Sequence, residues 1–153
     1  MRRPLRFVMY HRIFKIPVMN FIFRTARAIP IAPAKEDEAM LKRAYEEIDA
    51  ALKNGELIGL FPEGGLTPDG DIKEFTAGIE RIIARTPAPV VPMAVSGLWG
   101  SMWSRLHSNL RRARLPRRFR AQIELIAEAP VPASAVTAVG LEARVRELRG
   151  ARA

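Results

Sequence analysis

The chain has 153 residues, a length that suits one domain and allows a sizeable buried core. Hydrophobic residues make up 48% of it and cysteine is absent, which favours a globular protein and excludes a disulfide scaffold, a thiolate zinc site and a cysteine nucleophile. The net charge of +9 is unevenly spread, because residues 1–35 carry eight basic residues and no acid, residues 36–80 carry −8 and residues 81–153 carry +9. We therefore expect a polyanionic partner, either nucleic acid or anionic lipid.

Residues 5–24 mix apolar and aromatic side chains with basic ones, and Pro17 interrupts them, which favours a pair of short helices. Aromatic side chains beside basic ones are also typical of a surface that rests on anionic lipid, so residues 1–30 form a candidate membrane-interface segment. Residues 28–31 predict an edge strand, because they contain a proline. The longest uncharged stretch, residues 86–104, holds three prolines and two glycines, which favours a buried strand and loop over a membrane span.

The clearest helix is predicted over residues 35–54, where apolar side chains fall on one stripe and Gly55 provides the stop. Residues 57–61 then predict a buried strand. A second helix is expected to begin at Thr76, as its capping residue, and to run to about Arg85. Its inward side chains are expected to be Ile79, Ile82 and Ile83.

The later part of the chain predicts strands over residues 90–96 and 119–127 and a terminal helix over residues 139–148. Between the strands lies an Arg-rich segment, residues 105–120, with seven arginines and no acid. The alternation of strands and helices predicts a single α/β domain over residues 1–153, with a mixed central sheet flanked by helices.

The most informative stretch is residues 61–78, with the sequence FPEGGLTPDGDIKEFTAG. It follows a predicted strand, and α/β sheets commonly bind ligands at the carboxyl ends of their strands. The carboxylate of Glu63 can accept hydrogen bonds from ligand hydroxyls, and the glycine pair after it allows close backbone approach. Lys73 and the free amides at the start of the Thr76 helix can receive an anion. These residue types alone leave open a purely structural turn.

The same stretch carries a resemblance to a known family. Phe61-Pro62-Glu63-Gly64 after an apolar strand, followed by a polar loop and Phe75-x-x-Gly78, resembles the third sequence block of the phospholipid-biosynthesis acyltransferases. Residues 90–94 are similar to the fourth block, and residues 28–31 stand where the second would.

A further resemblance concerns one branch of that family. Residues 98–101 and 104–105 are similar to the branch that acylates 2-acyl-glycerophosphoethanolamine, so that the resemblance as a whole covers about residues 5–105. It implies a glycerolipid acyltransferase-like fold and a peripheral position on the cytoplasmic face of a membrane.

The activity implied by the resemblance is acyl transfer to the hydroxyl of a lysophospholipid or related glycerolipid. The acyl donor would be acyl-CoA or acyl carrier protein, as a co-substrate, with no cofactor and no metal. The residues expected to bind the substrates are Phe61, Pro62, Glu63, Gly64, Gly65, Leu66 and Thr67, with Lys73, Arg24 and Arg27 as sources of positive charge.

The catalytic block of the family is missing from the sequence. That block reads H-x-x-x-x-D, with the histidine as general base on the acceptor hydroxyl and the aspartate orienting it. Five residues after His11 stands Ile16, and five after His107 stands Arg112. We therefore expect the block to lie upstream of an N-terminally truncated domain, the chain alone to be inactive, and His11 to be an interface or core histidine.

Two further departures concern the acceptor. The third block often continues Thr-Arg-Ser, where this chain has Gly65, Leu66 and Thr67, and the second block usually ends in Asp-Arg, where it has Ala32 and Pro33. Both losses disfavour glycerol 3-phosphate and favour a larger acceptor.

Three hypotheses follow. The first is a membrane-peripheral acyltransferase domain, and the second a catalytically inactive derivative that binds lipid or acyl carrier protein. The third, a basic nucleic-acid-binding domain, rests on the arginines of residues 105–120 and is the least favoured, because recognition-helix, zinc-finger and aromatic RNA-binding signatures are missing from the sequence.

Overall fold

The computed structural model describes residues 3–65, 71–96 and 123–150. The chain divides into two compact units, one formed by Met1–Gly65 and Thr76–Ala88 and the other by Leu66–Phe75 and Pro89–Ala153. The Arg-rich segment, residues 105–120, lies outside the described residues, as do Leu66 and Thr67 of the expected substrate-binding loop.

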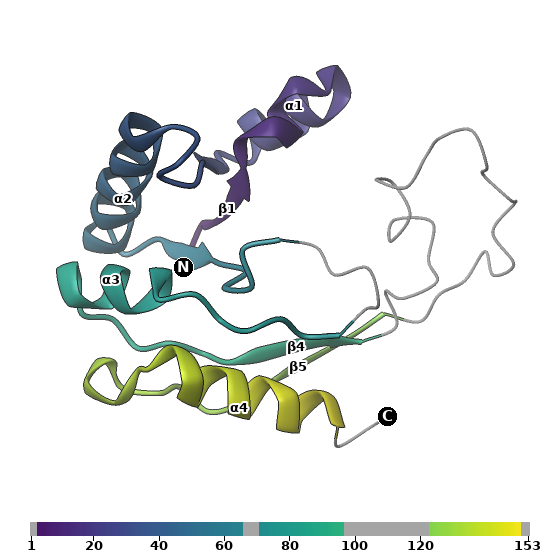
Figure 1. Ribbon diagram of the computed structural model, residues 1–153, viewed down its shortest axis with the longest axis vertical. Helices are drawn as coiled ribbons and strands as arrows, with labels where there is room; N and C mark the ends of the chain where they lie inside the picture. The colour runs from purple at the N-terminus through teal and green to yellow at the C-terminus, as the bar shows by residue number, and fades with distance from the viewer. Residues whose placement is uncertain (1–2, 66–70, 97–122, 151–153) are drawn as a thin grey trace, which may run out of the picture. The chain divides into compact units, whose positions relative to one another are not determined.

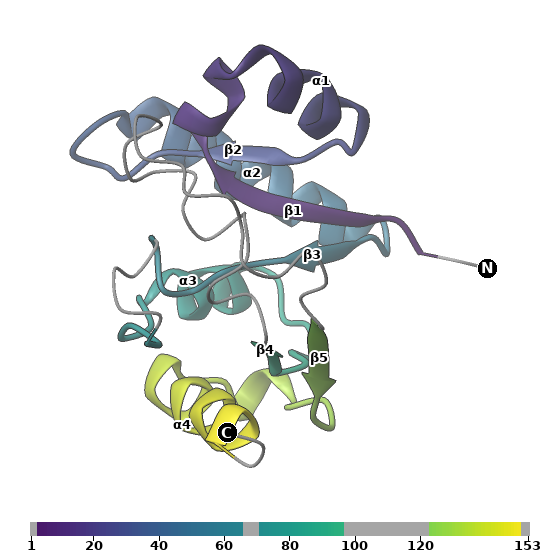
Figure 2. The same cartoon turned by 90° about the vertical axis from the view of Figure 1, so that its right-hand side faces the viewer.

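The first unit is built on a parallel sheet with the strand order β2-β1-β3 (Figure 2). The central strand β1 (Leu5–Tyr10) pairs with β2 (Ile29–Ile31) on one side and with β3 (Leu57–Gly59) on the other. Because all three strands run in the same direction, their carboxyl ends lie at one edge of the sheet and their amino ends at the other. The edge position expected for residues 28–31 is confirmed.

The expectation of two short helices over residues 5–24 is wrong for its first part, which forms β1. The side chains of this strand alternate, with Val8 buried on one face while Leu5 and Phe7 remain exposed on the other. Such a period of two is what an extended chain requires, and the interspersed basic residues concealed it.

The second part of this stretch is helical, as expected. It forms the short 3-10 helix η1 (His11–Lys15) and then α1 (Pro17–Thr25). Pro17 stands at the start of α1, where a missing backbone N–H removes no hydrogen bond.

The helix α2 (Glu38–Lys53) confirms the strongest sequence prediction. It begins at Asp37, whose carboxylate accepts a hydrogen bond of 2.8 Å from the backbone N–H of Met40. Its apolar stripe packs on β2 and β3 and, with Val8 of β1 and with α3, completes the core of the first unit. The buried members of this core are Val8, Ile29, Ala44, Ile48 and Ile82.

The helix α3 (Gly78–Arg85) also lies where it was expected, and its three isoleucines are buried. The capping residue differs, however, because the helix begins after Ala77 and no side chain caps it. The hydroxyl of Thr76 donates instead to the carbonyl oxygen of Pro62 at 3.1 Å, so this threonine ties α3 to the segment that follows β3.

The second unit contains the antiparallel pair of β4 (Met93–Ser96) and β5 (Glu124–Ala127), with the helix α4 (Ala138–Gly150) packed on β4 (Figure 1). A short 3-10 helix, η3 (Ala133–Ala135), precedes α4. These elements are the strands and terminal helix expected for the later part of the chain, although β4 is shorter than predicted. Residues 119–122 of the second predicted strand lie outside the described residues.

The expected α/β class, with a sheet flanked by helices, is confirmed, and the parallel and antiparallel pairings form two sheets. Among the helices of the described ranges, none has both the length and the apolar character needed to cross a bilayer.

Candidate functional site

The candidate site lies at the carboxyl edge of the parallel sheet. Three segments reach this edge: the residues that follow β3, the junction between β1 and η1, and the residues between β2 and α2, which include Glu36. Ligands of parallel α/β sheets commonly bind at this edge, because strands end there in loops that can carry functional groups.

The loop after β3 holds five of the residues expected from the sequence, and we call residues 61–65 the Phe61 loop. The carbonyl oxygen of Pro62 accepts hydrogen bonds from both the backbone N–H of Thr76, at 2.9 Å, and its hydroxyl. Gly64 has a φ of +67°, a conformation that other residues rarely adopt, and its N–H donates to the carbonyl oxygen of Phe61 at 3.3 Å. Glu63 is half-buried in this fixed turn.

An aromatic contact anchors the start of the Phe61 loop on the sheet. The rings of Phe7 and Phe61 stack at 6.2 Å between their centroids. Gly59 makes room for this contact, because a Cβ atom at that position would lie 2.6 Å from the ring of Phe7. A larger residue at position 59 would therefore displace the ring.

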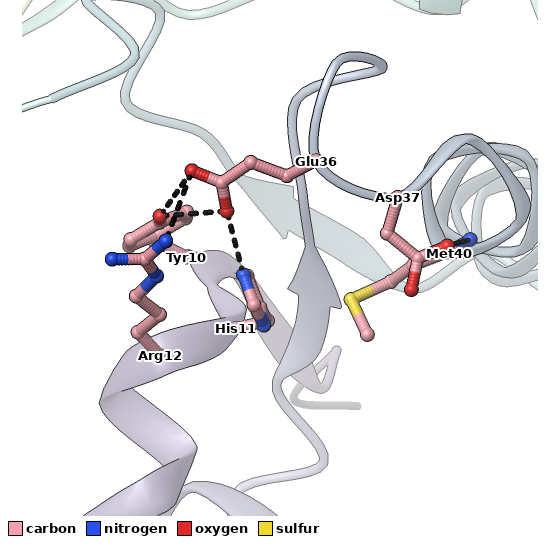
Figure 3. Close-up of polar contacts among 6 residues, drawn as sticks. All are labelled: Tyr10, His11, Arg12, Glu36, Asp37 and Met40. Carbon is pink, nitrogen blue, oxygen red and sulfur yellow. Dashed lines mark hydrogen bonds and ion pairs between the residues drawn. The ribbon is translucent and has the colours of Figure 1, made fainter.

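The junction of β1 and η1 carries a polar cluster, the Glu36 cluster, formed by Tyr10, His11, Arg12 and Glu36 (Figure 3). The carboxylate of Glu36 accepts hydrogen bonds of 2.8 Å from the Tyr10 hydroxyl, lies 3.0 Å from His11 Nε2 and forms an ion pair of 3.5 Å with Arg12. The guanidinium of Arg12 also lies 5.8 Å from the centroid of the Tyr10 ring. Three residues on consecutive positions thus converge on one carboxylate.

This arrangement shifts the ionisation of two groups. The hydrogen bonds from His11 and Tyr10 lower the pKa of the Glu36 carboxyl, and the hydrogen bond to Glu36 raises the pKa of the Tyr10 phenol. A neutral His11 that donates from Nε2 to Glu36 has Nδ1 as its acceptor nitrogen. The cluster is therefore a histidine whose ring is held by a carboxylate at the carboxyl edge of the sheet.

The expectation that His11 is an interface or core histidine did not include this partner. His11 is half-buried, and its ring contacts that of Tyr10 edge to face at 4.9 Å. The polar and aromatic residues Tyr10, His11 and Arg12 at the end of β1 are a sequence signal for such a cluster. The prediction of helices over residues 5–24 hides this signal, because it places no strand end there.

The two arginines expected to supply positive charge lie elsewhere in the first unit. Arg27 stands before β2, at the amino edge of the sheet, and forms an ion pair of 3.3 Å with Glu56, which precedes β3. Arg24 lies in the last turn of α1 and donates to the side chain of Asn20 at 2.7 Å. The structure does not bring Arg27 to the edge that carries the Phe61 loop.

Lys73 belongs to the second unit. The segment around it is held by α4, since the backbone N–H of Phe75 donates to Glu142 at 3.0 Å and Arg146 donates to the carbonyl oxygen of Ile72 at 2.6 Å. Leu66 and Thr67 fall outside the described residues. Within the parts of the chain that the structure describes, no group of three or more His, Cys, Asp or Glu side chains is placed to hold a metal ion.

Comparison with known proteins identifies relatives. The family model named Acyltransferase matches residues 1–96. A chloroplastic 1-acyl-sn-glycerol-3-phosphate acyltransferase of Brassica napus is 31% identical over 94 residues, which are 60% of this chain and 26% of that protein. An N-acylphosphatidylethanolamine synthase of Arabidopsis thaliana is 30% identical over 105 residues, which are 67% of this chain and 36% of that protein.

A solved structure shares the fold. The crystal structure of the 1-acyl-sn-glycerophosphate acyltransferase of Thermotoga maritima superposes with a TM-score of 0.65 at 22% sequence identity, covering 97% of this chain and 57% of that one. The chain thus spans only part of each of these proteins. The family match includes the whole parallel sheet, the Glu36 cluster and the Phe61 loop, and the chain belongs to the Acyltransferase family.

Proposed function

We propose that this chain serves acyl transfer from acyl-CoA or acyl carrier protein to the hydroxyl of a lysophospholipid or related glycerolipid. The observation that carries the proposal is the family match over residues 1–96, which includes the Phe61 loop. This loop follows a strand of a parallel sheet, and α/β sheets commonly bind ligands at the carboxyl ends of their strands. The names of the relatives support a glycerolipid acceptor, since they include acyltransferases of 1-acyl-sn-glycerol-3-phosphate. Because the chain spans 26% to 38% of these relatives, the activity of the whole protein is part of the proposal.

Within this proposal Glu63 binds the acceptor. Its carboxylate lies in a turn that two hydrogen bonds from Thr76 to Pro62 hold in place, so it can receive the hydroxyls of a glycerol backbone without reordering the loop. A lysophospholipid fits better than glycerol 3-phosphate, because the sequence has Gly65-Leu66-Thr67 where an arginine that contacts phosphate would stand.

The proton acceptor is the second part of the proposal. The sequence contains no H-x-x-x-x-D, so we place the catalytic histidine and aspartate outside residues 1–153. The same observation favours a second candidate function, a derivative that binds lipid or acyl carrier protein without transferring the acyl chain. We place the protein on the cytoplasmic side of a membrane, where the acyl donors are found.

The first test is binding of a monomeric lysophospholipid to the 153-residue chain, measured by isothermal titration calorimetry. We expect saturable binding that Glu63→Ala weakens by roughly tenfold or more, because a hydrogen bond to a charged group is lost. Glu46→Ala is the matched control, since Glu46 is an exposed glutamate on α2, and it should bind as the unchanged protein does. Equal affinity in both variants would reduce Glu63 to a structural residue.

The second test is release of thiol from acyl-CoA in the presence of the same acceptor. The chain has no cysteine, so a thiol reagent reports coenzyme A alone. We expect no release above background from residues 1–153, and release once a segment with H-x-x-x-x-D is joined to them. Release by the chain alone would show that its own residues supply the base, whereas failure of the joined protein to release thiol while it still binds lipid would favour the non-enzymatic candidate.

A further inference from the structure

The helix α1 presents an apolar face to solvent. Val18, Phe21 and Ile22 are 66%, 75% and 46% exposed, and their spacing places them on one side of the helix. On the other side Phe23 is half-buried, and its ring lies 5.5 Å from that of Phe14 in η1. The helix is thus attached through the side that carries Phe23, whereas Val18, Phe21 and Ile22 lie on the exposed side.

Basic residues flank this face. Lys15 and Arg24 are exposed at the two ends of α1, and neither forms an ion pair with another residue that the structure describes. Arg12 is also exposed, although it approaches Glu36. Residues 1–35 contain no acidic residue, so no carboxylate of this segment neutralises the positive charge. We call Val18, Phe21 and Ile22, with Lys15 and Arg24, the α1 surface.

The exposed apolar side chain of Val139 differs from this surface. Val139 is 79% exposed, yet it stands on α4, a helix that carries acidic as well as basic residues. A single exposed valine requires no explanation, whereas adjacent apolar side chains with a basic border match the chemistry of an anionic bilayer, which offers both acyl chains and phosphate groups. The nine residues of α1 are too few to span a bilayer, so the helix would lie in the interface.

We propose that the α1 surface docks the protein on an anionic lipid bilayer, with Val18, Phe21 and Ile22 entering the boundary between headgroups and acyl chains and with Lys15 and Arg24 at the lipid phosphates. This goes beyond the proposed function, because it rests on the exposure and charge of α1 and not on the Phe61 loop. It also narrows the expected membrane-interface segment, residues 1–30, since β1 belongs to the sheet.

The test uses the absence of cysteine from the chain. Phe21→Cys in the full 153-residue protein gives a single attachment site for the environment-sensitive fluorophore NBD, and Val139→Cys gives a matched site on α4. With vesicles of phosphatidylcholine and phosphatidylglycerol, the label at position 21 should brighten and shift to the blue, whereas the label at position 139 should not change. Phosphatidylcholine vesicles alone, or high salt, should abolish the response.

Vesicle flotation measures the contribution of each group. Phe21→Ser should lower the partition coefficient roughly tenfold, because a large apolar side chain no longer enters the lipid. Lys15→Gln should lower it roughly fivefold on anionic vesicles, and Val139→Ser should leave it unchanged. Equal thermal unfolding of the three variants shows that each remains folded.

Several outcomes would overturn the proposal: no flotation with anionic vesicles, flotation with equal NBD responses at positions 21 and 139, or binding of an oligonucleotide that depends on Phe21 in place of vesicle binding. Flotation is independent of acyl transfer. A protein that binds vesicles through Phe21 but neither binds lysophospholipid monomers nor releases thiol would retain the α1 surface and contradict the proposed function.

Discussion

The two edges of the parallel sheet carry similar residues that differ in their exposure. At the amino edge, Arg6 and Arg27 surround Glu56, whose side chain is 11% exposed. At the carboxyl edge, Tyr10, His11 and Arg12 surround Glu36, whose side chain is 34% exposed. Each edge therefore has a glutamate between cationic or hydrogen-bonding partners, but only the second leaves that glutamate accessible.

At the amino edge, a side chain binds the backbone of a neighbouring turn. Arg6 Nε donates to the carbonyl oxygen of Arg27 at 2.7 Å, and Arg27 adopts a φ of +53°, which is uncommon for a residue with a side chain. One oxygen of Glu56 is buried 3.7 Å from Arg6, near enough for an ion pair but beyond a hydrogen bond. These groups hold the turns before β2 and β3. The two edges thus differ in the exposure of their glutamates more than in the types of residue around them.

The largest expected effect on stability comes from removing Glu56 at the amino edge of the sheet. Glu56→Ala removes the partner of two arginines, one of them mostly buried, and should lower the free energy of unfolding by about 2 kcal/mol. Urea denaturation followed by circular dichroism measures this change. Glu47→Ala is the control, because Glu47 pairs with the same Arg6 through a half-exposed side chain and should cost less than about 1 kcal/mol. Equal losses would show that burial does not distinguish the two glutamates.

A smaller effect on stability distinguishes Asp37 from its neighbour Glu36 at the carboxyl edge. Asp37→Ala removes the cap of α2 and should lower the free energy of unfolding by about 1 kcal/mol, whereas Asp37→Asn should retain most of it. Glu36→Gln, one residue earlier, should destabilise the protein less than Asp37→Ala in the same urea titration. The opposite order would make the Glu36 cluster primarily a structural feature.

The smallest effect is a dependence on pH. The pKa of Glu36 is lowered in the folded protein, so its contribution to stability is complete above the ordinary carboxyl pKa and is lost as the pH falls through the lowered value. The difference in stability between the unchanged protein and Glu36→Gln should therefore be present at neutral pH and disappear in acid. Thermal unfolding over a series of pH values measures it.

A spectroscopic control belongs to that experiment. The chain has two tyrosines, and the hydrogen bond to Glu36 raises the pKa of Tyr10. In Glu36→Gln the phenol of Tyr10 should ionise at lower pH, as read from phenolate absorbance. An unchanged titration of Tyr10 would contradict the hydrogen bonds of the cluster.

The sequence predicted those elements whose local pattern agrees with their packing. The helix α2 has an apolar stripe, an acidic first turn and a glycine after its end, and each of these signals is local. The strand β1 was missed because its identity depends on pairing with distant segments, while its basic residues and the proline after it favoured a break between helices.

The candidate site was also predicted only in part from the sequence. The Phe61 loop was recognisable because one contiguous motif carries it, and it lies at the expected edge of the sheet. The Glu36 cluster joins residues on either side of α1 and β2, and Arg27 is removed from the loop by strand direction, so neither could be read from spacing along the chain.

The central place of β1 also fixes when the first unit can assemble. Both strands that pair with it, β2 and β3, come later in the chain, and the buried Val8 meets its partners on α2 and α3 only after Ile82 has been synthesised. A growing chain on the ribosome therefore carries this strand without its full set of partners through most of the synthesis of this unit. Chaperone binding to Leu5–Tyr10 during translation would follow from the topology alone.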